Sequence, residues 1–176
     1  MANFTKDLNA DQSIKSQFSN SLPIHIARVF HAPVDRVWQA WTQIDLIKQW
    51  WGPENYSAPE GTLDFREGGK YNLAMQGPDQ KVAWSGGVIK EIIPKEKIIY
   101  TDHFTDKDGK PVDAKEYGMS GNWPEELTIT VTFETVGDNE TRVTLLHEGI
   151  PTEMHDDCVQ GWSSSLDKLQ KLVERT

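Results

Sequence analysis

Two histidines and one cysteine near the end of the chain are the residues best suited to chemistry. His147 has inward parity in a segment that alternates apolar and polar residues, and His155 and Cys158 fall on the apolar side of a helical pattern that follows. If Pro151 brings strand and helix together, the three side chains share one space beneath the helix. A histidine there suits proton transfer, because its ordinary pKa lies near neutrality.

Other interpretations of these residues stay open. A buried neutral histidine that is hydrogen-bonded to the backbone or to a tyrosine has a structural role only. A metal site would need a fourth ligand, which this set does not supply. No phosphate-binding loop, dinucleotide fingerprint, serine-hydrolase motif or zinc-binding cysteine pair is present. The sequence therefore offers His147 and His155 as candidate catalytic residues, and it predicts no metal ion and no cofactor.

Large aromatic and sulfur-containing side chains could line a ligand-binding cavity. The chain contains seven tryptophans, and rings of this size either fill a core or surround a ligand. The residues predicted to line the cavity are Tyr71, Met75, Trp84, Tyr100, Met119, Trp123, His147, His155, Cys158 and Trp162. Because ordinary core packing uses the same residue types, the cavity is a hypothesis.

A long amphipathic helix at the C-terminal end must position the histidines. Pro151 precedes the expected N-cap, Thr152, and acidic residues in the first turn and basic residues in the last turns complement the helix dipole. One apolar stripe is shared by His155, Cys158, Val159, Trp162, Leu166, Leu169 and Val173. The breadth of this stripe indicates that the helix covers a sheet.

The preceding chain predicts that sheet. Strands are expected at residues 24–31, 62–66, 70–75, 82–93, 97–104, 127–134 and 141–148, with a bulge or a strong bend at Gly86-Gly87. Two short helices, 33–41 and 42–51, follow the first strand and end at Gly52-Pro53. Residues 105–126 form a long polar segment, expected to be either a mobile flap over the space under the helix or a loop that covers a sheet edge.

Length and charge limit the alternatives. The 176 residues suit one domain, residues 23–176, preceded by a polar and poorly ordered extension, residues 1–22. A net charge of −9 argues against nucleic acid as a partner. No apolar run is long enough for membrane insertion, and no signal peptide is recognisable. The single cysteine fits a reducing cytosol, so a cytoplasmic location is expected.

Four local motifs together resemble one family. They are Ala32-Pro33-Val34-Asp35-Arg36-Val37-Trp38, Trp50-Trp51-Gly52-Pro53, Asp64 to Gly69, and Gly161-Trp162 through Leu166-Asp167-Lys168-Leu169. As a set they are similar to the family named after the activator of heat-shock protein 90 ATPase, over about residues 24–174. The resemblance implies an α+β helix-grip fold, in which a curved antiparallel sheet wraps around a long C-terminal helix. Birch-pollen allergen, START domains and polyketide cyclases share this fold.

The resemblance implies three possible functions. The first is binding of a small, largely apolar molecule in a cavity between the sheet and the C-terminal helix. The second is a cyclase, aromatase or hydrolase activity in the same cavity, with His147 or His155 as proton carrier. The third is modulation of a chaperone ATPase, which would require a protein partner. The chain is expected to be a monomer or a homodimer, and because fold does not determine function, whether it is an enzyme stays open.

Overall fold

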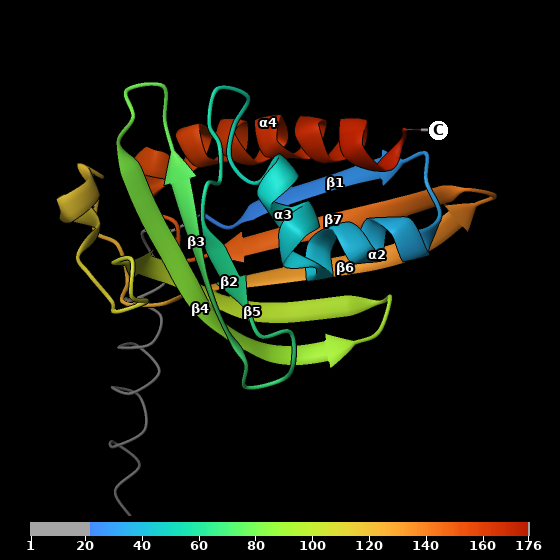
Figure 1. Cartoon of the computed structure of the whole chain (residues 1–176), viewed down its shortest axis with the longest axis horizontal. Helices are drawn as coiled ribbons and strands as arrows, with labels where there is room; N and C mark the ends of the chain where they lie inside the picture. Colours follow the sequence, from blue (N-terminus) through green and yellow to red (C-terminus); the bar gives the residue numbers. More distant parts are fainter. Residues whose placement is uncertain (1–21, 176) are drawn as a thin grey trace, which may run out of the picture.

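One antiparallel sheet of seven strands, with helices packed against one side, makes up the domain (Figure 1). This computed structural model describes residues 22–175, so the predicted extension, apart from Leu22, lies outside the described residues. The strands are β1 (Ile24–Phe30), β2 (Gly61–Leu63), β3 (Lys70–Gln76), β4 (Val82–Ile93), β5 (Lys97–Thr105), β6 (Leu127–Gly137) and β7 (Glu140–Glu148). The helices are α2 (Val34–Thr42), α3 (Ile44–Trp50) and α4 (His155–Val173), with short 3-10 turns η1 (Ala114–Tyr117) and η2 (Thr152–Met154).

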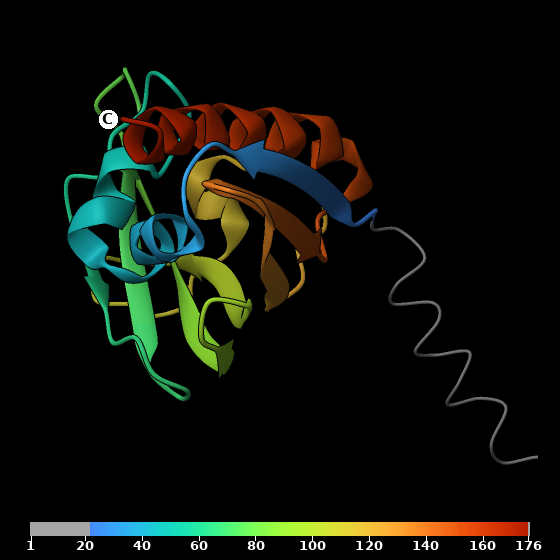
Figure 2. The same ribbon diagram turned by 90° about the vertical axis from the view of Figure 1, so that its right-hand side faces the viewer.

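The strand order is β1-β7-β6-β5-β4-β3-β2, so the first strand pairs with the last and only one long-range pairing departs from a meander. Strand β6 shows the predicted alternation, because Leu127, Ile129, Val131 and Phe133 are buried while the threonines between them are partly exposed. The sheet curves beneath α4, and α2 and α3 close one end of the concave side (Figure 2). The predicted helix-grip fold is confirmed.

Helix α4 starts later than the sequence predicts. Thr152 opens the 3-10 turn η2, and Met154 occupies the position before the first helical residue, His155. Pro151 is extended, with φ −56° and ψ 140°, and the chain needs one tighter turn before it reaches the direction of the helix. The N-cap prediction for Thr152 is therefore wrong. The buried residues of α4 all lie in its second half and are Ser165, Leu166, Leu169 and Val173.

The sheet differs from prediction around the paired glycines. The irregular register lies between Ile89 and Glu91, so Gly86-Gly87 is not the bulge. Gly87 is needed for close approach, since a Cβ there would lie 1.9 Å from the carbonyl oxygen of Thr101 on the neighbouring strand. Strand β2 is shorter than expected, and residues 105–126 contain η1 and are not wholly irregular.

Residues from the motifs tie the helices to one another. The Arg36 guanidinium on α2 donates to the carbonyl oxygens of Val173 (3.0 Å) and Arg175 (3.1 Å), which lie at the end of α4. The Lys168 ammonium donates to the carbonyl oxygens of Gly52 and Tyr56, at 3.0 Å each, in the loop that follows α3. Burial lowers the pKa of Lys168, although Glu54 opposes the shift. The two motif residues therefore hold α2 and the loop after α3 against α4, which is a role in the fold.

Replacing Lys168 with methionine should destabilise the protein by about 1–3 kcal/mol, because hydrogen bonds from a charged donor to two carbonyl groups are lost. Urea denaturation measures the change. Lys171→Met is the matched control, since Lys171 is one turn along α4 and makes only an exposed ion pair, 3.6 Å from Glu54. Equal losses in the two variants would contradict a special role for Lys168.

Candidate functional site

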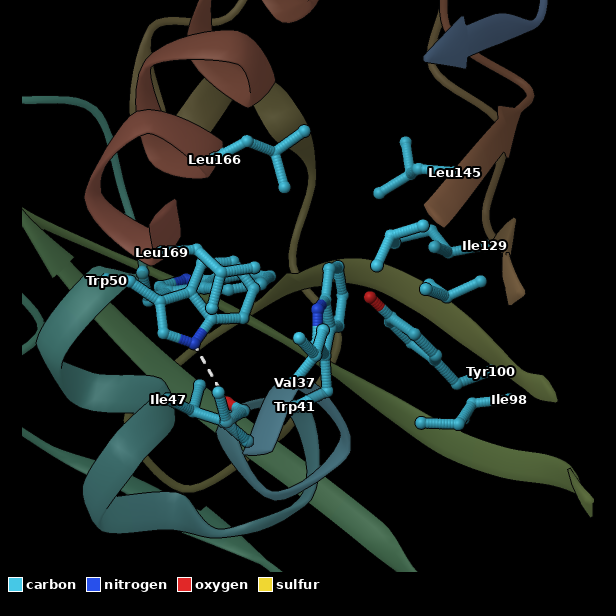
Figure 3. Packing of buried hydrophobic residues seen from close by; sticks show 14 of the residues in the cluster. Val37, Trp41, Ile47, Trp50, Ile98, Tyr100, Ile129, Leu145, Leu166 and Leu169 are labelled. Atoms are coloured by element: carbon cyan, nitrogen blue, oxygen red, sulfur yellow. Dashed lines mark hydrogen bonds between the residues drawn. The ribbon is translucent and has the colours of Figure 1, made fainter. Parts of the chain in front are cut away.

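An apolar cavity lies between the sheet and helices α2 and α3. Its lining includes Trp41, Trp50 and Trp51 from the helical side, and Tyr71 and Tyr100 from β3 and β5; Figure 3 shows Trp41, Trp50 and Tyr100 in the surrounding core. The cavity has a volume of about 40 Å³. Typical ligand pockets hold roughly 300–1,000 Å³, so this cavity has room for little more than a water molecule.

No residue of α4 lines this cavity. The cavity that the sequence predicts, beneath the C-terminal helix, is therefore displaced toward α2 and α3. The reason is that Leu166 and Leu169 are almost fully buried, together with Leu145 and Ile129 of the sheet, so this part of the core is filled (Figure 3).

Three buried nitrogen atoms have no hydrogen-bond partner among the described residues: Trp41 Nε1, Trp51 Nε1 and His147 Nε2. Their rings all pack against Trp162 of α4, with ring centroids 6.3 Å, 5.7 Å and 6.0 Å from it. Trp50, which lines the same cavity, differs because its Nε1 donates to the Ala40 carbonyl oxygen at 2.8 Å. A buried polar group without a partner costs roughly 1–3 kcal/mol, so this concentration around Trp162 requires an explanation.

His147 is held in one neutral form. Trp162 Nε1 donates to His147 Nδ1 at 3.0 Å, so the proton of the neutral ring lies on Nε2. Burial lowers the pKa of His147 to about 4. Near neutral pH the Nε2–H group of His147 is therefore a hydrogen-bond donor. His147 is a poor general base at this pH, because burial disfavours its protonated form.

Asp102 carries a partly buried carboxyl group that lies beside Tyr71, a residue of the cavity wall. The Tyr71 hydroxyl lies 2.8 Å from the Thr101 carbonyl oxygen and 2.9 Å from Asp102 Oδ1. The single proton of the hydroxyl is shared between the two oxygens when Asp102 is ionised, and when Asp102 is protonated it can donate to Tyr71 in turn. Burial raises the pKa of Asp102 to about 7, while the hydrogen bond from Tyr71 opposes the shift. Asp102 therefore exchanges protons near neutrality.

Gly87 allows Tyr71 to reach this carboxyl group. Tyr71 on β3 pairs with Gly87 on β4, and its hydroxyl lies against β5, the strand beyond. A side chain at Gly87 would fill the space next to Thr101. Tyr71 and Tyr100 then meet edge to face, with ring centroids 5.5 Å apart.

Cys158 is an unreactive thiol. Burial raises its pKa to about 11, and the charges of Asp157 and Asp102 add to the shift. Because the thiolate is the nucleophilic form, this cysteine does not serve as a nucleophile near neutral pH. Within residues 22–175 no group of three or more histidine, cysteine, aspartate or glutamate residues could hold a metal ion.

The ten residues predicted to line one cavity are dispersed. Tyr71 and Tyr100 line the apolar cavity, and His147 and Trp162 form the adjoining contact. Trp84 is not on the inward face: it pairs with Ala74 and borders an outer polar depression with Asn72 and Lys107, because its parity along β4 is opposite to the predicted one. The Nδ1 of His155, at the start of α4, lies 3.3 Å from Asp156 Oδ1, and Met75 lies near Gly52.

The segment 105–126, which includes Met119 and Trp123, packs near the start of α4. Trp123 meets Phe104 edge to face at 5.1 Å, and the Ser120 hydroxyl lies 3.2 Å from the sulfur of Met154. The Tyr117 hydroxyl donates to the Thr105 carbonyl oxygen, which fastens η1 to the end of β5. None of these residues borders the apolar cavity, so the segment covers a different end of the sheet from α2 and α3.

Sequence reasoning missed Asp102 and the free indole groups. Asp102 has the same parity as Tyr100 and Phe104 along β5, and an acidic residue at an inward position is the signal that could have identified it. Trp41 is buried as its place in the apolar pattern of α2 predicts, but the lack of a partner for its N–H depends on which helices surround it.

The curved seven-stranded sheet and the long C-terminal helix define a helix-grip protein of the α+β class. The chain belongs to the family described as Activator of Hsp90 ATPase homolog 1-like protein, whose sequence profile matches residues 31–174. The search among curated proteins found no match. No helix within residues 22–175 combines the length and the apolar character needed to cross a membrane.

Solved structures agree with this assignment. Protein CV1439 from Chromobacterium violaceum is 28% identical, with a TM-score of 0.71, and the match covers 88% of this chain and 98% of that chain. A protein from Staphylococcus epidermidis is 29% identical, with a TM-score of 0.64 and coverage of 86% and 88%. The AHSA1 protein of Silicibacter pomeroyi, at 22% identity, a TM-score of 0.69 and coverage of 85% and 96%, shows likeness of fold alone.

The Asp102→Asn variant should show a weaker pH dependence of stability than the wild type. The folded pKa of about 7 exceeds the ordinary 3.8, so the folded protein holds this proton more tightly than the unfolded chain. The resulting stabilisation is complete below the lower value and is lost as pH rises through the higher one. Asparagine stays neutral, so the variant should gain on the wild type by roughly 1.4 kcal/mol per unit of pKa shift.

Urea denaturation at a series of pH values measures this gain, and subtraction of the wild-type profile removes the contribution of His147, which both proteins share. Asp108→Asn, at an exposed position, is the control and should leave the profile unchanged. Parallel profiles for wild type and Asp102→Asn would show that the carboxyl group titrates normally.

Trp162→Ala should destabilise the protein by about 3–5 kcal/mol, the usual loss for truncation of a large aromatic residue in a core. Trp162 packs against Trp41, Trp51 and His147, so its removal takes one ring contact from each of the three and also the hydrogen bond to His147. Trp84→Ala, on the opposite face of the sheet, is the matched control and should cost roughly 1 kcal/mol. Thermal and urea denaturation measure both losses of stability. A larger loss for Trp84→Ala than for Trp162→Ala would contradict this prediction.

Proposed function

We propose that the protein binds a small, largely apolar molecule between its sheet and helices α2 and α3. The observation that supports this most directly is the lining of the cavity. Its aromatic and aliphatic side chains would surround a ligand with carbon atoms and few polar groups. The family adds support, because the START-like fold commonly binds hydrophobic ligands.

A ligand requires the cavity to open. At about 40 Å³ the cavity has no room for a molecule of several carbon atoms. Helix α3 has only seven residues, and the loop after it is held to α4 by the Lys168 hydrogen bonds. We infer that α3 and this loop move away from the sheet when a ligand enters, which reduces the apparent affinity by the cost of the motion.

A variant with a larger cavity tests this proposal. Ile98 is almost fully buried and lines the cavity, so Ile98→Ala adds room without a polar group. The probe is α-methylstyrene, an aromatic hydrocarbon that has no hydrogen-bonding oxygen or nitrogen atom. We expect it to shift the NMR signals of Ile47 and Ile89 methyl groups in the wild type, and to bind Ile98→Ala at least about threefold more tightly.

Ile24→Ala is the matched control. Ile24 on β1 is equally buried but does not line the cavity, so its loss should lower stability without improving the affinity for the probe. Absence of binding to both the wild type and Ile98→Ala would refute the proposal. Methyl shifts spread over the whole protein would indicate nonspecific association.

A catalytic function is the second candidate, and Asp102 is the observation that favours it. A carboxyl group with a pKa of about 7, hydrogen-bonded to a tyrosine that lines the cavity, has the properties of a general acid or base. His147, with its lowered pKa, is less suited to the proton transfer that the sequence assigned to it. A pH–rate profile whose limb near 7 disappears in Asp102→Asn would support the enzyme, once a substrate is found.

A further inference from the structure

We propose that the bound molecule carries a neutral carbonyl group, and that its oxygen accepts hydrogen bonds from the indole N–H groups of Trp41 and Trp51. This inference rests on the proposed function and names the chemical class of the ligand. It begins with the two indole groups, which come from different elements: Trp41 lies in α2 and Trp51 directly follows α3. Both residues line the cavity.

The indole N–H groups are not needed for packing. Trp41 is 6% exposed and Trp51 is 8% exposed, and neither Nε1 has a partner among the described residues. A phenylalanine at either position would offer an aromatic face without a buried donor, so two unpaired N–H groups on residues that line one cavity are costly and point to a use. Trp50 provides the contrast, because its N–H is satisfied by Ala40 within the protein.

The free groups around the cavity are donors, so the missing partner is an acceptor. An indole nitrogen can only donate, and the proton on His147 Nε2 makes that atom a donor as well. The Tyr100 hydroxyl oxygen, which can donate or accept, points toward the interior beside Trp41 (Figure 3). Carbonyl, ether and carboxylate oxygens would all satisfy such donors.

The charges near the cavity favour a neutral acceptor. Its lining contains no lysine, arginine or histidine, and the nearby His147 is neutral because burial lowers its pKa to about 4. Asp102, hydrogen-bonded to Tyr71 in the cavity wall, adds negative charge whenever it ionises. A buried carboxylate without a cation is strongly disfavoured, whereas a ketone, aldehyde, ester or amide oxygen needs only the donors.

One competing explanation is internal to the protein. The rings of Trp51 and Trp162 meet at 89°, with centroids 5.7 Å apart, which is a geometry in which an N–H group can face an aromatic ring. Such a contact is a weak hydrogen bond and would partly satisfy one indole without any ligand. It predicts that the Trp51 N–H signal does not respond to a carbonyl compound.

Three probes of similar shape separate these explanations: acetophenone, which has a carbonyl oxygen; α-methylstyrene, in which a CH₂ group replaces that oxygen; and benzoate, an anion. Each is titrated into the full chain with ¹⁵N-labelled tryptophan. We expect acetophenone to bind about tenfold more tightly than α-methylstyrene, and benzoate to bind most weakly. The Trp41 and Trp51 indole N–H signals should move downfield with acetophenone only, while the Trp50 signal keeps its position.

Two variants locate the preference. Trp51→Phe should reduce the affinity ratio of acetophenone to α-methylstyrene by about threefold or more, because one donor is lost. Trp50→Phe is the matched control: it removes an indole that lines the same cavity but whose N–H is already paired, so the ratio should be retained. The changes in the Trp41 and Trp51 indole N–H signals are measured in the wild type. The test therefore does not depend on either variant being stable.

The outcomes distinguish this inference from the proposed function. Equal binding of acetophenone and α-methylstyrene, with unmoved indole signals, would overturn the carbonyl assignment and leave apolar binding intact. Tightest binding of benzoate would overturn the choice of a neutral group. Failure of all three probes to bind would refute both the inference and the function on which it rests.

Discussion

The packing of Trp162 against three other rings is the interaction on which the rest of the structure depends. Trp162 comes from α4, Trp41 from α2, Trp51 from the end of α3 and His147 from β7, so one side chain joins every layer of the domain. Rings of this size bury much area, and their contacts are worth about 0.5–1.5 kcal/mol beyond that area. The same packing leaves the free nitrogen atoms of Trp41, Trp51 and His147 inside the protein.

The polar residues around these rings are of two kinds: some stabilise the fold, and others cost stability. Arg36 and Lys168 donate hydrogen bonds to backbone carbonyl groups. These contacts hold α2 and the loop after α3 against α4 and so stabilise the fold. Asp102 and the free indole groups of Trp41 and Trp51 do the opposite, because their burial costs stability. Residues that are retained despite such a cost are the better guide to function, whereas the motifs that identify the family describe its architecture.

The cavity has one side formed by the sheet and one side formed by α2, α3 and the residue after α3. Tyr71 and Tyr100 lie on central strands, and Tyr71 is fixed by hydrogen bonds to Thr101 and Asp102. Trp50 and Trp51 belong to the short helix α3 and the start of the loop after it, and Lys168 of α4 binds this loop. Under the proposed function, the tyrosine side would position a ligand, and the tryptophan side would have to move to admit it, because the cavity holds only about 40 Å³.

The sequence by itself determined the strands, the three helices and their apolar faces, because alternation and helical periodicity are local properties: residues 127–134 and the stripe from Cys158 to Val173 show them directly. The motifs added the family. Only the tertiary structure decided that the cavity lies under α2 and α3, that Trp84 faces outward and that Asp102 is partly buried beside Tyr71. Burial, cavity position and hydrogen-bond satisfaction depend on which elements meet across the chain, and residue spacing does not contain that information.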